Sequence, residues 1–139
     1  MTSTDVTPIK VSVVEDHDRF RAGLTTMLEG YPEFRCVGAY RTAEEALAKI
    51  PQARPDVVLM DIELPRRSGI ECVRELSRRM PSVPIMMLTA YDDPEKIFES
   101  LRAGACGYLL KRTPPGELLE AIQDCTVEGR QCQRRLRDA

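Results

Sequence analysis

Long apolar stretches are missing from this sequence of 139 residues, which argues against a protein built into a membrane. No apolar run approaches the ~20 residues that a helix needs to cross a bilayer. The first residues, 1–5, also lack the basic-then-apolar pattern of a secretory signal peptide. We therefore expect a protein that works in the cytoplasm.

Closely spaced cysteines are also missing, and only one histidine is present. The cysteines are odd in number and include no C-x-x-C pair, so the sequence predicts neither a disulfide framework nor a zinc site. Four of the five lie in apolar patterns, and we interpret these as buried thiols. The set is Cys36, Cys72, Cys106, Cys125 and Cys132. The single histidine, His17, is predicted to lie in a loop or at a helix start, and not to bind a metal.

A charge excess of either sign is absent as well. The 20 basic and 22 acidic residues give a net charge of −2, which offers no general attraction to nucleic acid or anionic lipid. Apolar residues make up 42% of a chain whose length suits one domain with a single core. We expect a flexible N-terminus over residues 1–8, one domain over 9–129, and a basic tail or truncated linker over 130–139.

Apolar runs alternate with segments of helical periodicity along that domain. The runs cover residues 9–14, 34–39, 55–61, 84–88 and 108–110. A helical pattern follows each run; the fourth is predicted to turn Ile97, Phe98 and Leu101 inward, and the fifth to fade near Gly129. Such alternation predicts an α/β fold with a five-stranded parallel sheet and helices on both faces. For five strands the common doubly wound order is 2-1-3-4-5.

Polar residues stand where the predicted strands end. Glu15 and Asp16 follow the first strand and Asp61 ends the third, while Thr89 and Lys111 follow the fourth and fifth. The first and third strands are neighbours in the expected order, so three carboxylates converge at the carboxyl edge of the sheet, where ligands bind in such folds. Two carboxylates about 4 Å apart repel by roughly 4 kcal/mol at an effective dielectric near 20. The cluster therefore predicts a compensating cation.

The types of residue in this cluster suit phosphoryl chemistry. Mg²⁺ takes one or two carboxylates, keeps several waters and accepts phosphate oxygens. The Lys111 amine and the Thr89 hydroxyl suit a phosphoryl group bound near Asp61. A carboxylate can act as a nucleophile and form an acyl phosphate, and phosphoryl transfer asks the protein mainly for positioning and charge neutralisation.

Four segments, taken in order on these strand ends, resemble the receiver domain of two-component response regulators. They are VVEDH (13–17), DVVLMD (56–61), MLTA (87–90) and GACGYLLK (104–111). The resemblance extends from residue 9 to about residue 128 and implies a CheY-like, flavodoxin-like fold. The local sequence GYLLK (107–111) is similar to the LuxR/NarL-type branch of that family.

The resemblance implies a role for each matching residue. Asp61 would accept a phosphoryl group from the phosphohistidine of a sensor histidine kinase. Glu15 and Asp16, with Asp61 and the backbone carbonyl of Glu63, would hold Mg²⁺. Thr89 and Lys111 would bind the phosphoryl oxygens.

The resemblance also implies a conformational switch. Thr89 and Tyr108 would form it, with the tyrosine ring turning inward as the threonine hydroxyl moves to the phosphate. Glu63 and Tyr91 match the variable positions that tune dephosphorylation. One departure is that Arg112 follows Lys111, where many receivers have a proline after a cis peptide bond. A cis bond before a non-proline residue costs about 3 kcal/mol, so the loop after Lys111 is expected to be trans or strained.

The expected function is a phosphorylation-activated signalling switch and not an enzyme, since it would assist only its own phosphorylation and dephosphorylation. Its output is expected to be transcription through a C-terminal DNA-binding domain absent from this sequence, with a possible homodimer on phosphorylation. One alternative is a stand-alone receiver that acts by protein–protein contact. A second is an aspartate-nucleophile phosphatase, because Asp61-Ile62-Glu63 faintly resembles its D-x-D motif. A nucleotide- or flavin-binding domain is disfavoured, since Glu15 and Asp16 stand where phosphate would bind.

Overall fold

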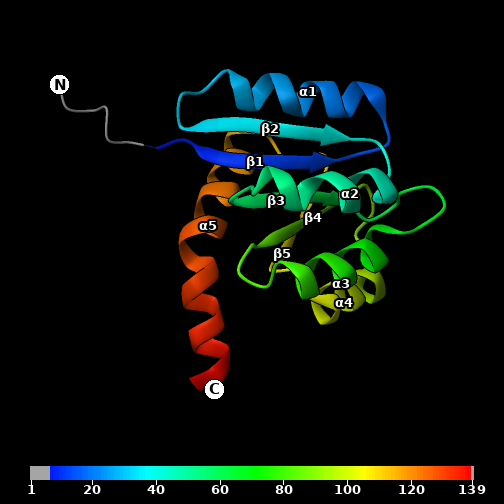
Figure 1. Cartoon of the computed structure of the whole chain (residues 1–139), viewed down its shortest axis with the longest axis vertical. Helices are drawn as coiled ribbons and strands as arrows, with labels where there is room; N and C mark the ends of the chain where they lie inside the picture. Colours follow the sequence, from blue (N-terminus) through cyan, green and yellow to red (C-terminus); the bar gives the residue numbers. More distant parts are fainter. Residues whose placement is uncertain (1–6, 139) are drawn as a thin grey trace.

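The computed structural model describes residues 7–138, with side chains described for residues 7–126. Its strands form one parallel sheet in the order β2-β1-β3-β4-β5, which confirms the order expected from the sequence. The strands are β1 (Ile9–Val14), β2 (Phe34–Tyr40), β3 (Val57–Asp61), β4 (Ile85–Thr89) and β5 (Gly107–Leu110). The helices are α1 (Asp18–Glu29), α2 (Ala43–Ala53), α3 (Gly69–Arg79), α4 (Pro94–Ala103) and α5 (Pro115–Asp138) (Figure 1).

Two hydrophobic clusters, one on each face of the sheet, hold the helices in place. Alternate residues of β3 join different clusters: Val58 and Met60 join one, and Val57 and Leu59 join the other. The first cluster includes buried side chains of α2 and α3, and the second those of α1 and α5. Each β3 side chain from Val57 to Met60 is at most 1% exposed, as expected of a central strand covered on both faces.

A proline within α2 is accommodated by a contact from α3. Pro51 has no N–H with which to bond the carbonyl of Leu47 one turn earlier. The guanidinium of Arg79 donates to that carbonyl instead, at 3.2 Å. The two helices are thus joined at the point where α2 loses a backbone hydrogen bond.

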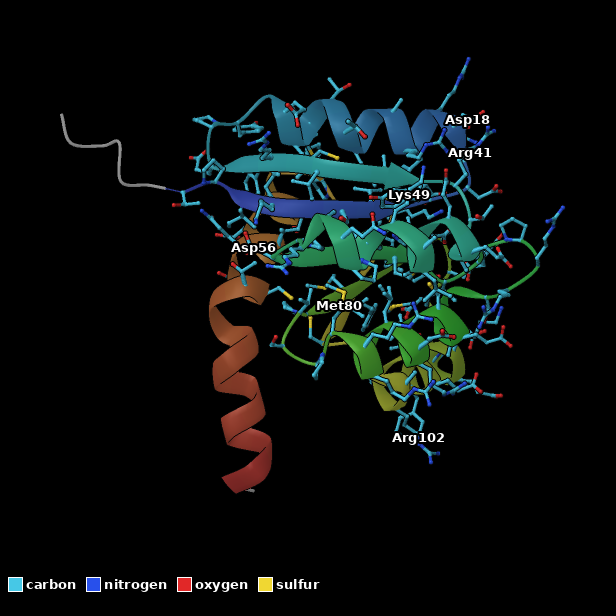
Figure 2. All side chains as sticks on the ribbon, in the orientation of Figure 1. Asp18, Arg41, Lys49, Asp56, Met80 and Arg102 are labelled. Atoms are coloured by element: carbon cyan, nitrogen blue, oxygen red, sulfur yellow. The ribbon has the colours of Figure 1, made fainter. Side chains whose placement is uncertain are left out.

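The inner face of α4 differs from the prediction. Ile97 is buried as expected, but Phe98 and Leu101 are 60% and 42% exposed. The positions that face inward are Ile97, Ser100 and Ala103, and the small side chains of Ser100 and Ala103 let α4 pack closely on α3. Phe98 instead stacks under the guanidinium of Arg102, which points away from the sheet at 5.8 Å from the ring centroid (Figure 2).

The last helix is longer than predicted. The prediction that it fades near Gly129 is wrong, because α5 continues to Asp138. Most residues beyond Gly129 favour helix, and one glycine costs only about 1 kcal/mol. The predicted flexible N-terminus falls largely outside the described residues, and the role of 130–139 as a tail or linker stays a prediction. Among the helices of the described part of the chain, none combines the length and the apolar character that a membrane span requires.

Candidate functional site

The strand register brings the predicted site residues to one edge of the sheet. Asp61 is the last residue of β3, and the neighbouring β1 ends at Val14, opposite Met60. Glu15 therefore follows directly beside Asp61. On the other side Thr89 ends β4 and lies opposite Leu110 of β5, so that Lys111 follows at the same edge. The structure thus assembles Glu15, Asp61 and Lys111, three of the residues expected from the sequence.

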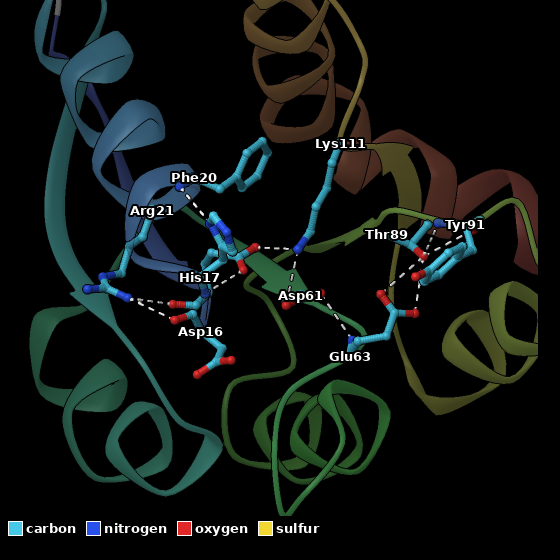
Figure 3. Close-up of polar contacts among 10 residues, drawn as sticks. Asp16, His17, Phe20, Arg21, Asp61, Glu63, Thr89, Tyr91 and Lys111 are labelled. Atoms are coloured by element: carbon cyan, nitrogen blue, oxygen red, sulfur yellow. Dashed lines mark hydrogen bonds and ion pairs between the residues drawn. The ribbon is translucent and has the colours of Figure 1, made fainter.

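Lys111 lies between two buried carboxylates. Its Nζ is 2.8 Å from Oε1 of Glu15 and 3.3 Å from Oδ2 of Asp61 (Figure 3). Its ammonium group also lies 5.2 Å from the centroid of the Phe20 ring. The side chain of Lys111 is 20% exposed, whereas those of Glu15 and Asp61 are 1% and 2% exposed. A single ammonium group therefore contacts both carboxylates in a largely desolvated site and balances only one of their two negative charges.

The three carboxylates differ in how they are held. Glu15 accepts a hydrogen bond from the backbone N–H of His17 on Oε2, and Lys111 occupies its Oε1. Asp61 accepts the backbone N–H of Glu63 on Oδ1 at 3.0 Å. Asp16 is exposed, and its carboxylate is directed away from Lys111 (Figure 3). Glu15 therefore serves to fix Lys111, while Asp16 is open to solvent.

The donor set fits Mg²⁺ even though the side chains do not enclose a metal as they stand. Among the described residues, no three acidic, histidine or cysteine side chains are arranged as a metal cluster. Mg²⁺ does not need such a cluster, since it keeps several waters and uses one or two carboxylates. Glu15 and Asp61 contact Lys111, and the carboxylate of Asp16 beside them is open to solvent. All three supply hard oxygen atoms. The residues present therefore fit the ion that the resemblance implies.

Burial and mutual repulsion change the proton affinities of the site. Burial, followed by the charge of Glu15, raises the pKa of Asp61 from 3.8 to about 6, although Lys111 and the N–H of Glu63 act in the opposite direction. Burial lowers the pKa of Lys111, but hydrogen bonding and charge from Glu15 and Asp61 outweigh that effect, so its pKa is raised overall. At neutral pH the site therefore holds a charged lysine and a mostly ionised Asp61.

The Thr89 hydroxyl is engaged by the loop that follows β4. It accepts a hydrogen bond from the backbone N–H of Tyr91 at 3.1 Å, and it lies 3.0 Å from the carbonyl of the same residue. The carboxylate of Glu63 lies 3.3 Å from it. Thr89 is itself 1% exposed, while Tyr91 and Tyr108 are 66% and 41% exposed. The hydroxyl thus contacts Tyr91 and Glu63, and the ring of Tyr108 reaches the surface.

The peptide bond between Lys111 and Arg112 is trans, one of the two outcomes expected for a receiver-like sequence without proline here. The backbone N–H of Lys111 donates to the carbonyl of Thr89 at 2.8 Å, which extends the β4–β5 ladder by one residue. The N–H of Thr113 then closes a turn onto the carbonyl of Leu110 at 2.9 Å. Lys111 therefore reaches the site from a fixed backbone.

Three further residues support the site and were not assigned to it from the sequence. Arg21 donates to the backbone carbonyl of Glu15 at 3.0 Å and so braces the acidic loop. Phe20, on α1, places its ring beside Lys111. Gly69 lies so close that a Cβ atom there would stand 1.9 Å from the carbonyl oxygen of Asp61. No pattern in the sequence indicates these contacts, because each forms between different elements of the fold.

A family model and the related proteins all indicate the same family for this chain. A family model described as the response regulator receiver domain matches residues 11–123. The DNA-binding transcriptional activator DevR/DosR of Mycobacterium tuberculosis is 40% identical over 116 residues, which are 84% of this chain and 54% of that protein. The transcriptional regulatory protein DegU of Brevibacillus brevis is 36% identical over 83% of this chain and 49% of its own length.

Solved structures agree with the sequence matches. A CheY-like response regulator receiver domain protein from Methanospirillum hungatei superposes with a TM-score of 0.82 and 30% identity, over 90% of this chain and 98% of that one. The receiver domain of the response regulator NarL from Mycobacterium tuberculosis gives a TM-score of 0.81 and 28% identity, over 86% and 96%. This chain spans about half the length of the curated relatives that it matches.

Proposed function

Because this chain belongs to the response regulator receiver family, we propose that it is a phosphorylation-driven switch whose phosphoacceptor is Asp61. The phosphoryl donor would be the phosphohistidine of a sensor histidine kinase. The observation that carries the proposal is the pairing of a buried carboxylate with a partly buried amine at the carboxyl edge of the sheet, 3.3 Å apart. Asp61 supplies a nucleophile, and Lys111 supplies a positive charge beside it.

The proposed transfer forms a bond between a carboxylate oxygen of Asp61 and phosphorus, and breaks the bond from phosphorus to the donor. At pH 7 a carboxyl group with a pKa of about 6 is mostly ionised and therefore able to attack. Lys111 remains protonated and offsets negative charge on the phosphoryl oxygens, with Glu15 fixing its position. Bound Mg²⁺, held by Asp16, Asp61, the backbone carbonyl of Glu63 and the neighbouring Glu15, would neutralise the remaining charge.

The proposed switch rests on the positions of Thr89 and Tyr108. The hydroxyl of Thr89 now contacts the loop at Tyr91, and the ring of Tyr108 is exposed, which is the arrangement expected before phosphorylation. A phosphoryl group on Asp61 offers the hydroxyl a charged acceptor, a stronger partner than a neutral carbonyl. Moving the hydroxyl would release the loop at Tyr91 and let the ring of Tyr108 turn inward.

Glu63 and Tyr91 are proposed to set the lifetime of the phosphoryl group. The carboxylate of Glu63 lies 3.3 Å from the Thr89 hydroxyl, and the backbone of Tyr91 holds the same hydroxyl. Both residues therefore adjoin the hydroxyl that would contact the phosphoryl group. Substitution at either position is expected to change the rate of dephosphorylation more than the extent of phosphorylation.

One experiment tests the phosphoacceptor directly. The protein is incubated with acetyl phosphate and Mg²⁺, and its intact mass is measured. We expect one phosphoryl adduct that requires Mg²⁺ and disappears in Asp61→Asn. The matched control is Asp56→Asn, which removes an exposed carboxylate from the segment before the same strand and should leave the adduct unchanged. An adduct that persists in Asp61→Asn, or no adduct with any phosphodonor, would overturn the proposal.

The output is proposed to be transcription, because the named relatives are transcriptional regulators about twice as long as this chain. A C-terminal domain would then contact DNA, and phosphorylation would favour a homodimer. A stand-alone receiver acting in the cytoplasm by protein–protein contact is the alternative. Size measurement with and without the phosphoryl mimic beryllofluoride tests dimerisation. Turnover of a generic phosphate ester would instead support the phosphatase alternative.

A further inference from the structure

Two cysteine sulfurs meet at the sheet edge opposite Asp61. The Sγ atoms of Cys106 and Cys125 are 2.7 Å apart, compared with about 2.05 Å in a disulfide bond. Cys106 directly precedes β5, and Cys125 lies on α5. The sequence, which has no close cysteine pair, did not indicate this contact, because the two residues are 19 positions apart.

The two cysteines differ in how far they are exposed to solvent. Cys106 is exposed, contrary to the expectation of a buried thiol for most cysteines, whereas Cys125 is 7% exposed and belongs to the core cluster under α5. The backbone of Cys106 is fixed, since its N–H donates to the carbonyl of Ile85 at 2.8 Å. Cys106 is therefore the residue of the pair that solvent reaches, and Cys125 is held behind it in the core.

We propose that Cys106 and Cys125 are a reversible thiol–disulfide pair that hydrogen peroxide oxidises, joining the turn before β5 to α5. The Cys106 thiolate attacks one peroxide oxygen, which forms sulfenic acid and releases hydroxide. The Cys125 thiol then attacks the sulfenic sulfur, forms the disulfide and releases water. Two electrons pass from the two sulfurs to the peroxide, and a dithiol reductant reverses the change.

The hydrogen bond between the two thiols favours this sequence. It lowers the pKa of Cys106 by more than burial of the sulfur raises it, so Cys106 forms thiolate more readily than an ordinary cysteine. Cys72 provides an internal contrast, because burial raises the pKa of its thiol to about 12. Reaction with peroxide is therefore expected at Cys106 and not at Cys72.

The pair is separate from the phosphoacceptor site. Cys106 precedes β5, while Lys111 follows it, so about 15 Å of extended strand lies between them. The disulfide and the phosphorylation of Asp61 are thus distinguishable in experiment. Cys106→Ser should leave the Mg²⁺-dependent acetyl phosphate adduct unchanged, and failure of that adduct in wild type would not bear on the disulfide.

Peptide mapping tests the proposal. The full chain is treated with hydrogen peroxide, remaining thiols are alkylated, and the digest is analysed by mass spectrometry without reduction. We expect the peptides containing Cys106 and Cys125 to be linked, with a mass two hydrogens below their sum, and the link to disappear after a dithiol reductant. Cys106→Ser changes the exposed residue of the pair and leaves Cys125 in the core, and Cys72→Ser is the control that should retain the link.

A thermal measurement gives a second readout. Closing a loop of this length should raise the melting temperature of the oxidised protein by about 10 °C, and Cys106→Ser should abolish that rise. Cys125→Ala should abolish it as well, which keeps the test valid if one variant folds poorly. Linkage through Cys36 or Cys132, or alkylation of both Cys106 and Cys125 after peroxide, would overturn the proposal.

Discussion

At the scale of single residues, the charge of Asp61 opposes folding. The raised pKa, from 3.8 to about 6, means that the unfolded chain releases this proton more readily than the folded one. The stability that the folded state gains from holding this proton is fully present below pH 3.8. It is lost as the pH rises through about 6. We predict that Asp61→Asn raises the free energy of unfolding near pH 7 by about 1–3 kcal/mol, measured by urea denaturation in EDTA.

The comparison that isolates this effect is again Asp56→Asn. Its side chain is exposed, and an asparagine oxygen can still accept the backbone N–H of Lys10 that Asp56 accepts at 2.9 Å, so the free energy of unfolding should change by less than about 0.5 kcal/mol. The wild-type protein should lose stability between about pH 4 and 6 relative to Asp61→Asn, because only the wild type ionises at this position. Equal pH profiles for the wild type and Asp61→Asn would contradict the raised pKa of Asp61, which burial and then the charge of Glu15 cause.

A second prediction at this scale compares the ion pairs of Lys111 with an ion pair on the surface. Lys111→Met leaves Glu15 and Asp61 buried without a cation, and we predict a loss of about 3 kcal/mol near pH 7. Lys49→Met breaks an exposed pair with Glu45 at 3.8 Å and should cost about 0.5 kcal/mol or less. Chemical denaturation of both variants measures the difference, and similar losses would contradict it.

At the scale of elements, the start of α3 lies against the end of β3. A Cβ atom on Gly69 would meet the carbonyl oxygen of Asp61 at 1.9 Å, so alanine requires the helix to move away from the site. We predict that Gly69→Ala lowers the free energy of unfolding by about 1–3 kcal/mol and slows phosphorylation of Asp61 by acetyl phosphate.

The matched substitution is Gly23→Ala in α1. No atom lies within 4 Å of the added Cβ, and alanine favours helix, so we expect a gain of about 0.5–1 kcal/mol and an unchanged phosphorylation rate. Urea denaturation and the rate of adduct formation are measured for both variants. The prediction fails if Gly69→Ala is as stable and as reactive as Gly23→Ala.

The elements that the sequence predicted well are those with one dominant pattern. The short apolar run that ends at Asp61 predicted a covered strand, and the sheet has the order that is common for five alternating units. The inner face of α4 was mispredicted because large apolar residues were assumed to face inward. Phe98 instead packs under Arg102, and the inner position is taken by Ser100, whose hydroxyl donates to Lys96 within the same helix.

The site was predictable where a residue's place on a strand end fixed its position, and not where contacts join separate elements. Glu15, Asp61 and Lys111 fall together because parallel strands end at one edge. The outward direction of Asp16 and the support from Arg21 and Gly69 depend on side-chain packing that a linear pattern does not encode. The contact between Cys106 and Cys125 was missed for the same reason.

At the scale of the whole molecule, a ligand that binds only the folded state shifts the global unfolding equilibrium. Three carboxylates and one lysine leave the site with excess negative charge, so Mg²⁺ should bind the folded chain in preference to the unfolded one. At about ten times the dissociation constant, the gain is about 1.4 kcal/mol, or a few degrees in melting temperature. We predict this rise on adding MgCl₂ to EDTA-treated protein, measured by thermal denaturation.

A variant of Asp16, the exposed one of the three carboxylates, tests whether Mg²⁺ stabilises the protein by binding at this site. Asp16→Asn should leave the metal-free melting temperature nearly unchanged, since its side chain is solvated, but should reduce the shift caused by Mg²⁺. KCl at matched ionic strength should not reproduce the shift, because screening alone acts on all surface charges. An equal Mg²⁺ shift in wild type and Asp16→Asn would instead place the ion away from Asp16, and the proposed ligand set would then be wrong.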